Sequence, residues 1–323
     1  MLSRKLKINL KGLEVGTTPM LLPSLSSRIN LDVQKTLETI SEFVDGPLLI
    51  SALDYNVINR PLITFPELIF LDSGGYECNK DQDVTDIGFY TYKNDWTKQM
   101  YSEVIDSWKN EIPTVLISYD HPTIRVPVEE QIQEALNFFS KRDKFLKEIL
   151  FKPETKESRR IKPEKIIELI DDLDGFDIIG FTEKELGNSV FNRMVNIAKI
   201  RIAMDKKGLE KPIHIFGSLD TITTPLYYLA GADIFDGLSW LRYVFYKSNT
   251  LYLDSVGPKL HGVGMNINKI WIQSIYQNYE YLRHLKSLLG RFSVSGDFDL
   301  FGDNSRFFNN SYQDLIEEIG DDK

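Results

Sequence analysis

The chain has 323 residues, of which 42% are hydrophobic and 12% aromatic, and its formal net charge is −9. This is the composition of a globular protein with a sizeable core, and the acidic balance argues against a protein that grips nucleic acid over a wide surface. Cys78 is the single cysteine, which excludes an internal disulfide framework and indicates a reducing compartment, so we expect a cytoplasmic protein. No apolar run approaches the about 20 residues that cross a bilayer, and we expect no membrane association.

Eight short apolar runs are predicted to form strands. They are Met20–Leu22, Leu48–Ala52, Leu68–Leu71, Thr114–Tyr119, Ile149–Lys152, Ile178–Phe181, Ile213–Gly217 and Ala232–Phe235. Segments with helical spacing of apolar residues lie between them, as in Glu129–Ile149, Ile166–Leu173 and Val190–Asp205. Strands that alternate with helices indicate parallel βα units, in either a closed barrel or a doubly wound sheet. Eight strands favour the (β/α)8 barrel, the TIM barrel.

The C-terminal part of the chain is predicted to be a helical extension. We place the barrel in residues 1–250 and the extension, packed on the barrel, in residues 251–323. Residues 270–289 have an amphipathic pattern whose apolar face either covers the barrel or binds a partner. That face carries Trp271, Ile275, Tyr279, Leu282 and Leu285. The acidic tail, Asp314 to Lys323, is expected to fray.

Three predicted strands end in aspartate. Asp72 follows LIFL, Asp120 follows VLISY and Asp236 follows ADIF. Any one of them fits a helix cap or a turn, which aspartate commonly forms. The ends of parallel barrel strands share one rim, however, so we expect the three carboxylates to converge there. Carboxylates in a shared cleft raise one another's pKa and can divide into nucleophile, base and recognition roles.

Glycines accompany these aspartates. Gly74 and Gly75 follow Asp72, and Gly217 and Gly237 end the last two strand regions. Paired glycines permit positive φ angles and close approach of the backbone to a flat ligand. Each of them also fits an ordinary loop.

Aromatic and histidine side chains give a weaker signal. Tyr76 and Phe216 are candidates to sandwich a planar ring, although either fits core packing equally well. The four histidines are scattered, and none has the spacing of a metal site. His214 lies within an apolar run and is interpreted as a satisfied core histidine. We therefore expect neither a metal nor a cofactor.

At these residues the chain resembles the tRNA-guanine transglycosylase family. The similarity spans about residues 15 to 245, and the aspartate motifs occur in the family's order. In the motif around Asp72, Glu77 stands where the family has glutamine. The similar segments are TPMLLPS (18–24), LLISALDYN (48–56), LDSGGYE (71–77), SYDH (118–121), PIHIFG (212–217) and GADIFDGLSWLR (231–242).

The resemblance implies a (β/α)8 barrel enzyme that exchanges a base on a ribose. Asp236 would attack the anomeric carbon and expel a guanine-like base, leaving a covalent ester that an incoming 7-deazaguanine then displaces. Asp72 would handle the proton of the incoming base, and Asp120 would accept hydrogen bonds from its ring N–H and amine. The further substrate-binding positions that the resemblance implies are Ser73, Gly74, Gly75, Tyr76, Gly180, Phe216, Gly217 and Arg242.

Some segments depart from the family pattern. Members that act on tRNA carry a zinc site of three cysteines and a histidine after the nucleophile strand, and here that region has no cysteine. Lys152 or Pro153 replaces a glutamine that helps to hold the base, and Gly237 replaces a cysteine. The resemblance therefore implies retained chemistry at the ribose, an altered base pocket and weak or no tRNA binding. The helical extension would take the place of the zinc module.

Two classes of function follow. The first is an enzyme that handles 7-deazaguanine or guanine on a target other than ordinary tRNA, either DNA or a deazaguanine-modified partner protein. The resemblance extends to transglycosylase-like proteins of type IV CBASS antiphage operons, which implies a cGAS-like nucleotidyltransferase as the partner. The second class is a non-catalytic subunit that binds such a partner, and a homodimer is compatible with both. The three aspartates favour the enzyme, because clustered carboxylates are costly to keep without a function.

Overall fold

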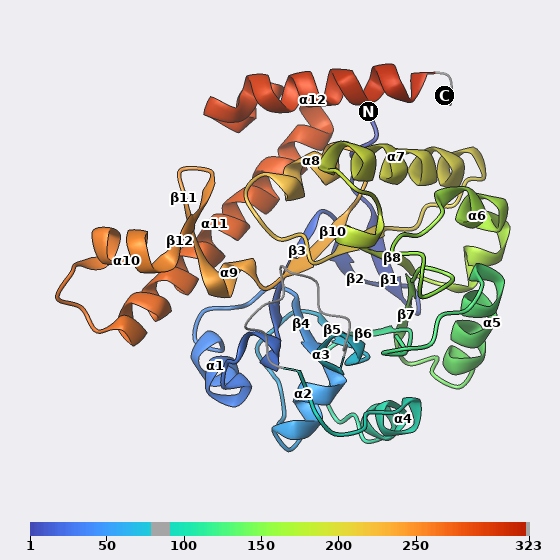
Figure 1. The fold of residues 1–323 in the computed structure, drawn as a ribbon, viewed down its shortest axis with the longest axis horizontal. Coiled ribbons are helices and arrows are strands. Elements are labelled where there is room, and N and C mark those ends of the chain that lie inside the picture. The colour runs from blue at the N-terminus through green and yellow to red at the C-terminus, as the bar shows by residue number, and fades with distance from the viewer. Residues whose placement is uncertain (79–90, 321–323) are drawn as a thin grey trace.

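Eight parallel strands close into a barrel (Figure 1). In the computed structural model, which describes residues 1–78 and 91–320, the strands are β3 Met20–Leu25, β4 Leu48–Ser51, β5 Ile69–Asp72, β6 Thr114–Ile117, β7 Leu146–Phe151, β8 Ile178–Thr182, β9 Ile213–Phe216 and β10 Ile234–Gly237. They follow one another around the barrel in chain order, and β10 pairs with β3 to close it. The predicted (β/α)8 barrel is confirmed.

Helices that follow the strands form the outer layer of the barrel (Figure 1). They are α1 Val33–Ile40, α2 Ala52–Val57, the short α3 Gly75–Cys78, α4 Lys98–Asp106, α5 Val128–Phe139, α6 Pro163–Glu168, α7 Val190–Lys206 and α8 Thr223–Leu229. Side-chain caps fix several of the helix starts. Asp32, Ser51 and Thr97 accept hydrogen bonds from backbone N–H groups in the first turns of α1, α2 and α4.

The predicted helix Glu129–Ile149 is too long. The helix α5 ends at Phe139, and the apolar residues from Leu146 onward form β7, in which Leu146 pairs with Val115 of β6. Nearly every residue of β7 is buried. A parallel strand buried on both faces is apolar at consecutive positions, which helical spacing also fits over one or two turns.

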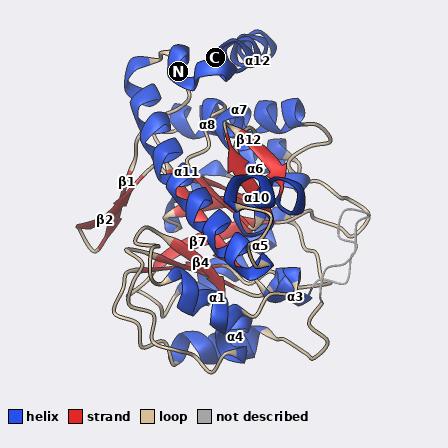
Figure 2. Ribbon diagram, turned by 90° about the vertical axis from the view of Figure 1, so that its left-hand side faces the viewer, coloured by secondary structure: helices blue, strands red, loops and turns tan. Residues whose placement is uncertain are grey.

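A hairpin closes one end of the barrel interior. The hairpin consists of β1 Lys7–Leu10 and β2 Leu13–Thr17 and lies at one side of the molecule in Figure 2. Ile8 of this hairpin joins the apolar cluster inside the barrel, together with Met20 at the start of β3. The opposite rim, where the strands have their carboxyl ends, is therefore the end at which a site can form.

The chain after β10 adds further elements. They are α9 Ser239–Arg242, the hairpin β11 Tyr243–Tyr246 and β12 Asn249–Tyr252, α10 Leu253–His261, α11 Ile267–Ser295, the 3₁₀ helix η5 Phe298–Asn304 and α12 Ser305–Glu318. Figure 1 shows α10 and the β11–β12 hairpin at one side of the barrel. The helix α12 lies across α8 and α7. Within residues 1–78 and 91–320, no helix has both the length and the apolarity that crossing a membrane requires.

The apolar face of α11 packs on the barrel. Ile275, Tyr279, Leu282 and Leu285 are buried in the main core, and Trp271 is half-buried against it. The Tyr279 hydroxyl donates to Asp45 at 2.7 Å, before β4. Asn278 donates to the backbone oxygens of Trp240 and Tyr243, at 2.7 Å each. Of the two interpretations of this face, the structure supports the one in which it covers the barrel.

The predicted fraying of the acidic tail is wrong for the part that the structure describes. The helix α12 continues to Glu318, and the side chains of Leu315 and Ile319 are fully buried. The two apolar residues lie four positions apart and share one helix face, while the acidic residues between them are exposed. Residues 321–323 of the tail lie outside the described residues.

The docking of α12 predicts a large effect at one position. Leu315→Ala should lower the free energy of unfolding by about 2–4 kcal/mol, because it leaves a cavity where a fully buried side chain stood. Urea unfolding followed by circular dichroism measures the change. The exposed neighbour substitution Glu317→Ala should stay within about 0.5 kcal/mol of the parent protein. A Leu315→Ala variant as stable as the parent would show that α12 is undocked in solution.

Candidate active site

Three aspartates meet at the carboxyl rim of the barrel. Asp72 is the last residue of β5, Asp236 lies in β10, and Asp120 follows the end of β6. Asp72 and Asp236 are buried, whereas Asp120 is partly exposed. Burial raises the pKa of Asp72, and the negative charges of Asp120 and Asp236 add to this effect, so that the pKa is about 6. Asp72 therefore lies within electrostatic range of both other carboxylates.

The residues after Asp72 join the ends of β5 and β6. Gly74 has φ +89° and donates its backbone N–H to the Asp72 carboxylate at 3.1 Å. The Ser73 hydroxyl accepts the backbone N–H of Asp120 at 3.1 Å. A Cβ on Gly75 would lie 2.5 Å from the Asp120 carbonyl oxygen. The glycine pair thus allows the Asp72 turn and the Asp120 loop to touch.

The carboxylate of Asp236 is held by groups from two neighbouring strand ends. Oδ2 accepts the Ser24 hydroxyl of β3 at 2.8 Å, and Oδ1 accepts the backbone N–H of Gly217 at 3.1 Å. Gly217 has φ +84°, and no described atom lies within 4 Å of the position a Cβ would take there. The surroundings of Gly217 therefore leave space for a ligand beside Asp236.

A histidine links Asp236 to a second buried carboxylate. His214 Nδ1 lies 2.7 Å from Glu148 Oε1, and His214 Nε2 lies 3.3 Å from Asp236 Oδ1. Burial lowers the pKa of His214, but Glu148 and Asp236 outweigh it and raise the pKa to about 9. His214 is buried, as its interpretation as a core histidine predicted. Its two acidic neighbours, Glu148 and Asp236, were not predicted. Glu148 and His214 each interrupt an apolar strand, and that signal could have identified them.

Phe216 and Gly180 belong to the surroundings of this histidine. The Phe216 ring stacks on the His214 ring, with centroids 3.9 Å apart and planes 28° apart. A Cβ on Gly180 would lie 2.7 Å from Phe216 Cε2 and 2.8 Å from Glu148 Oε1. The structure thus gives Gly180 a packing role, in which it makes room for Phe216 and Glu148.

Tyr76 and Arg242 are both exposed. Tyr76 is 42% exposed, and the guanidinium carbon of Arg28 lies 5.4 Å from its ring centroid. Arg242 is the exposed last residue of α9, and its guanidinium carbon lies 5.5 Å from the Tyr243 ring centroid. Neither contact places these side chains against the buried aspartates.

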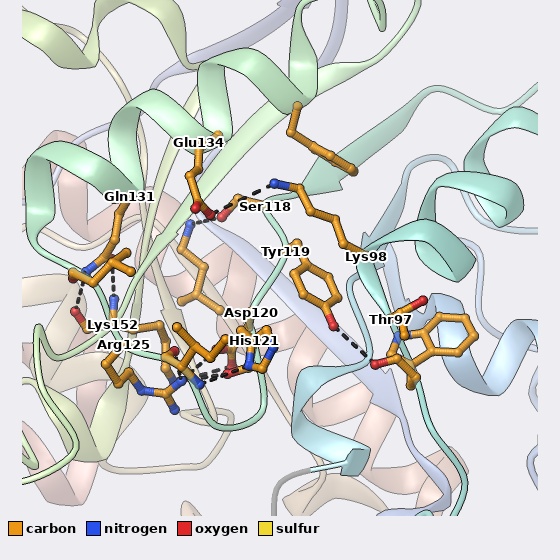
Figure 3. A pocket seen from close by; sticks show the side chains of 16 residues that line it. Thr97, Lys98, Ser118, Tyr119, Asp120, His121, Arg125, Gln131, Glu134 and Lys152 are labelled. Atoms are coloured by element: carbon orange, nitrogen blue, oxygen red, sulfur yellow. Dashed lines mark hydrogen bonds and ion pairs between the residues drawn. The ribbon is translucent and has the colours of Figure 1, made fainter.

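A cavity of about 350 Å³ opens beside Asp120 (Figure 3). It lies between α4, α5 and the ends of β6 and β7, and Asp72 and Asp236 do not line it. Its charged lining includes Lys98, Asp120, Arg125, Glu134 and Lys152. The volume suits a small molecule such as a nucleobase. Asp120 therefore lines this cavity and also lies within electrostatic range of Asp72.

Two cations compensate the charge of Asp120. Arg125 Nη1 and Lys152 Nζ each lie 3.6 Å from its carboxylate oxygens, and Lys152 also pairs with Glu185 at 2.8 Å. Burial lowers the pKa of Lys152, but Asp120 and Glu185 outweigh it and raise the pKa overall. Asp120 Oδ1 has no hydrogen-bond partner among the described residues, so it retains acceptor capacity for a ligand.

Glu77 occupies the glutamine position of the Asp72 motif as a buried acid. The Ser26 hydroxyl donates to Glu77 Oε1 at 2.5 Å. Burial raises the pKa of Glu77 well above its usual value, and the charges of Asp54 and Asp72 add to the effect. A protonated carboxyl group has the neutral charge and nearly the shape of a glutamine amide.

Across the described residues, no cluster of three or more His, Cys, Asp or Glu side chains is arranged to hold a metal ion.

The protonation of Glu77 predicts how stability depends on pH. Its pKa is higher in the folded than in the unfolded protein, so Glu77 destabilises the fold as pH rises through and above its unfolded pKa. Glu77→Gln removes this dependence and should make the protein more stable than the parent at pH 8 but not at pH 4.5. Unfolding midpoints in guanidinium chloride across that range test this. The exposed Glu157→Gln should retain the parent's pH dependence, and a Glu77→Gln variant that also retains it would contradict the assignment.

Comparison with known proteins gives no further indication of a family. No protein-family model matches the chain, and no curated protein sequence matches it. The resemblance to tRNA-guanine transglycosylases accordingly rests on the six similar segments alone.

Proposed function

We propose that the protein exchanges guanine or 7-deazaguanine on a ribose through a covalent ester of Asp236. The observation that carries the proposal is the convergence of the three aspartates at the barrel rim. Asp72 interacts electrostatically with both Asp120 and Asp236, and each of the three ends or follows a different strand. The transglycosylase resemblance supplies the roles, and the observed positions are compatible with them.

The reaction consists of two displacements at the anomeric carbon. A carboxylate oxygen of Asp236 bonds to that carbon, while the bond to the leaving base breaks and its electron pair stays on the base nitrogen. The nitrogen of the incoming base then bonds to the carbon, and the electron pair of the ester bond returns to Asp236. Asp72 takes the N–H proton of the incoming base. A pKa of about 6 suits this task, because Asp72 is mostly ionised at neutral pH and still readily protonated.

Asp120 and Lys152 form the proposed recognition site for the base. Asp120 Oδ1 is free to accept hydrogen bonds from the base N–H groups. Lys152 is one of the two residues, with Pro153, that the resemblance sets at the glutamine position, and its ammonium group can donate to the carbonyl oxygen of the base. The adjoining cavity, with Lys98 and Arg125 in its lining, accommodates further groups of the substrate. The target is proposed to be DNA or a deazaguanine-modified partner protein rather than ordinary tRNA.

One observation favours the alternative, a subunit that binds a deazaguanine-bearing partner without catalysis. Arg125 and Lys152 already compensate the charge of Asp120, and donors already contact both oxygens of Asp236. Such a site can hold a ligand without reacting with it. The two functions differ in whether an ester forms.

The first test separates the nucleophile from the recognition residue. Asp236→Asn should reduce base exchange at least about a thousandfold, because an amide cannot form the ester. It should change the affinity for free 7-cyano-7-deazaguanine by less than about twofold, since the base does not bond to Asp236. Asp120→Ala should instead weaken that binding by about 1–3 kcal/mol in calorimetry. The exposed control Asp174→Asn should leave both unchanged.

The donors for this test are deazaguanine nucleosides, single-stranded DNA that contains 7-deazaguanine, and tRNA as the expected poor donor. Full exchange activity of Asp236→Asn on any of them would refute the ester. Base binding without exchange on any donor, in the parent and in every variant, would support the binding subunit instead.

The second test uses the pKa of Asp72. The rate of the second displacement should fall as pH decreases below about 6, because a protonated Asp72 cannot accept the proton of the incoming base. The midpoint should lie below that of the free protein, because Asp236 has lost its charge in the ester. Asp72→Asn should slow this step at every pH and let the ester accumulate, which intact-protein mass spectrometry detects. A rate that stays constant down to the acid limit of the folded protein would remove Asp72 from the mechanism.

A further inference from the structure

A histidine with two acidic neighbours lies inside the barrel beneath the proposed nucleophile. Glu148 of β7, His214 of β9 and Asp236 of β10 come from three strands, and the first two are completely buried. His214 Nδ1 contacts Glu148 Oε1 at 2.7 Å. His214 Nε2 lies 3.3 Å from Asp236 Oδ1 and has no hydrogen-bond partner among the described residues. A buried ring nitrogen thus lies within ion-pair distance of the proposed reacting group.

The other sides of the ring are apolar. The ring of Phe70 in β5 meets that of His214 edge-on, with centroids 5.6 Å apart, and Phe216 in β9 stacks on it at 3.9 Å. On β8, Gly180 presents no side chain. The charged groups that face the ring are therefore Glu148 and Asp236, and burial gives their charges a strong effect on it.

We propose that Glu148 and His214 are positioning residues that keep a positive charge against Asp236 and make it a better leaving group when the ester breaks down. This inference rests on the proposed function and adds to it a role for two residues that the transglycosylase resemblance does not supply. Neither residue is proposed to touch the substrate.

The charge balance of the two displacements gives the reason. Before the reaction, a cationic His214 faces the carboxyl groups of Glu148 and Asp236. Burial raises the pKa of Glu148, and the charge and hydrogen bond of His214 oppose that effect. When the ester forms, Asp236 loses its charge, and the buried imidazolium keeps only Glu148 as an ionic partner. In the second displacement the carbon–oxygen bond breaks, its electron pair returns to Asp236, and the proton of the incoming base goes to Asp72. The charge that develops on Asp236 is then stabilised by His214, by the Ser24 hydroxyl and by the Gly217 N–H.

The pair could instead serve only to fill the barrel, and Glu148→Gln distinguishes the two roles. The amide preserves size and one hydrogen bond to His214 but removes the charge that keeps the ring protonated. A packing role predicts little change in the lifetime of the ester, even where the substitution leaves the ring neutral. The positioning role requires a cationic ring in the parent protein and predicts a longer-lived ester once that charge is lost.

The first experiment measures the charge of the ring without any substrate. Nitrogen NMR of the full-length protein labelled with ¹⁵N-histidine should show His214 with both nitrogens protonated at pH 7.5, and the spectrum of His214→Gln identifies its signals. In Glu148→Gln the titration midpoint should fall by at least about one pH unit. If Glu148→Gln does not fold, Asp236→Asn removes the other anion and should shift the midpoint in the same direction. A neutral His214 in the parent protein at pH 7.5 would overturn the inference and leave the proposed function standing.

The second experiment measures the ester, with single-stranded DNA containing 7-deazaguanine as donor and 7-cyano-7-deazaguanine as acceptor. At a pH where the ring is cationic in the parent and neutral in Glu148→Gln, the steady-state fraction of protein carrying an adduct should be about tenfold higher in Glu148→Gln, because the charge that stabilises the departing Asp236 carboxylate is absent. The matched control is Glu183→Gln, a carboxylate whose partners are Arg193 and Tyr227 rather than His214 or Asp236, which should leave the fraction unchanged.

An adduct whose fraction is the same in Glu148→Gln and the parent would overturn the inference while confirming the ester. No adduct in any variant, Asp72→Asn included, would overturn the proposed function and the inference with it. A cationic His214 together with the raised adduct fraction supports both.

Discussion

The pairing of β10 with β3 is the constraint on which the candidate site depends. It closes the barrel and sets Asp236 opposite Leu22, two residues before Ser24. The Ser24 hydroxyl can then donate to the carboxylate of Asp236 and accept the backbone N–H of Gly237. Because all eight strands are parallel, closure also puts the ends of β5 and β6 on the same rim as the end of β10. Asp72 and Asp120 thereby reach the neighbourhood of an aspartate more than a hundred residues away in the chain.

Inside a closed barrel with apolar walls, each buried carboxylate destabilises the fold unless it has an ion-pair or hydrogen-bond partner or is protonated. Asp236 has two hydrogen-bond donors and the ring of His214 beside it, whereas Asp72 and Glu77 have raised pKa values. Asp120, which is partly exposed, has Arg125 and Lys152. The site therefore holds carboxyl groups with hydrogen-bond or ion-pair partners beside carboxyl groups with raised pKa values, an arrangement that suits a reaction in which one group forms a bond and another carries a proton.

The sequence predicted the strands well, because buried parallel strands appear as short apolar runs between turn residues, and the convergence of the aspartates followed from strand direction alone. The boundary between α5 and β7 was missed, since a short apolar run fits both periods. The contact of His214 with Glu148 was also missed. The two residues lie 66 positions apart, and only the inward direction of both side chains in the closed barrel brings them together.

The most direct test of the account is the pKa of Asp72, measured by carbon NMR of its carboxyl group. The account predicts a pKa of about 6 in the parent protein and a lower value in both Asp236→Asn and Asp120→Asn, because each substitution removes one of the two charges that raise it. An Asp72 pKa that neither substitution lowers would show that the three aspartates do not form one site.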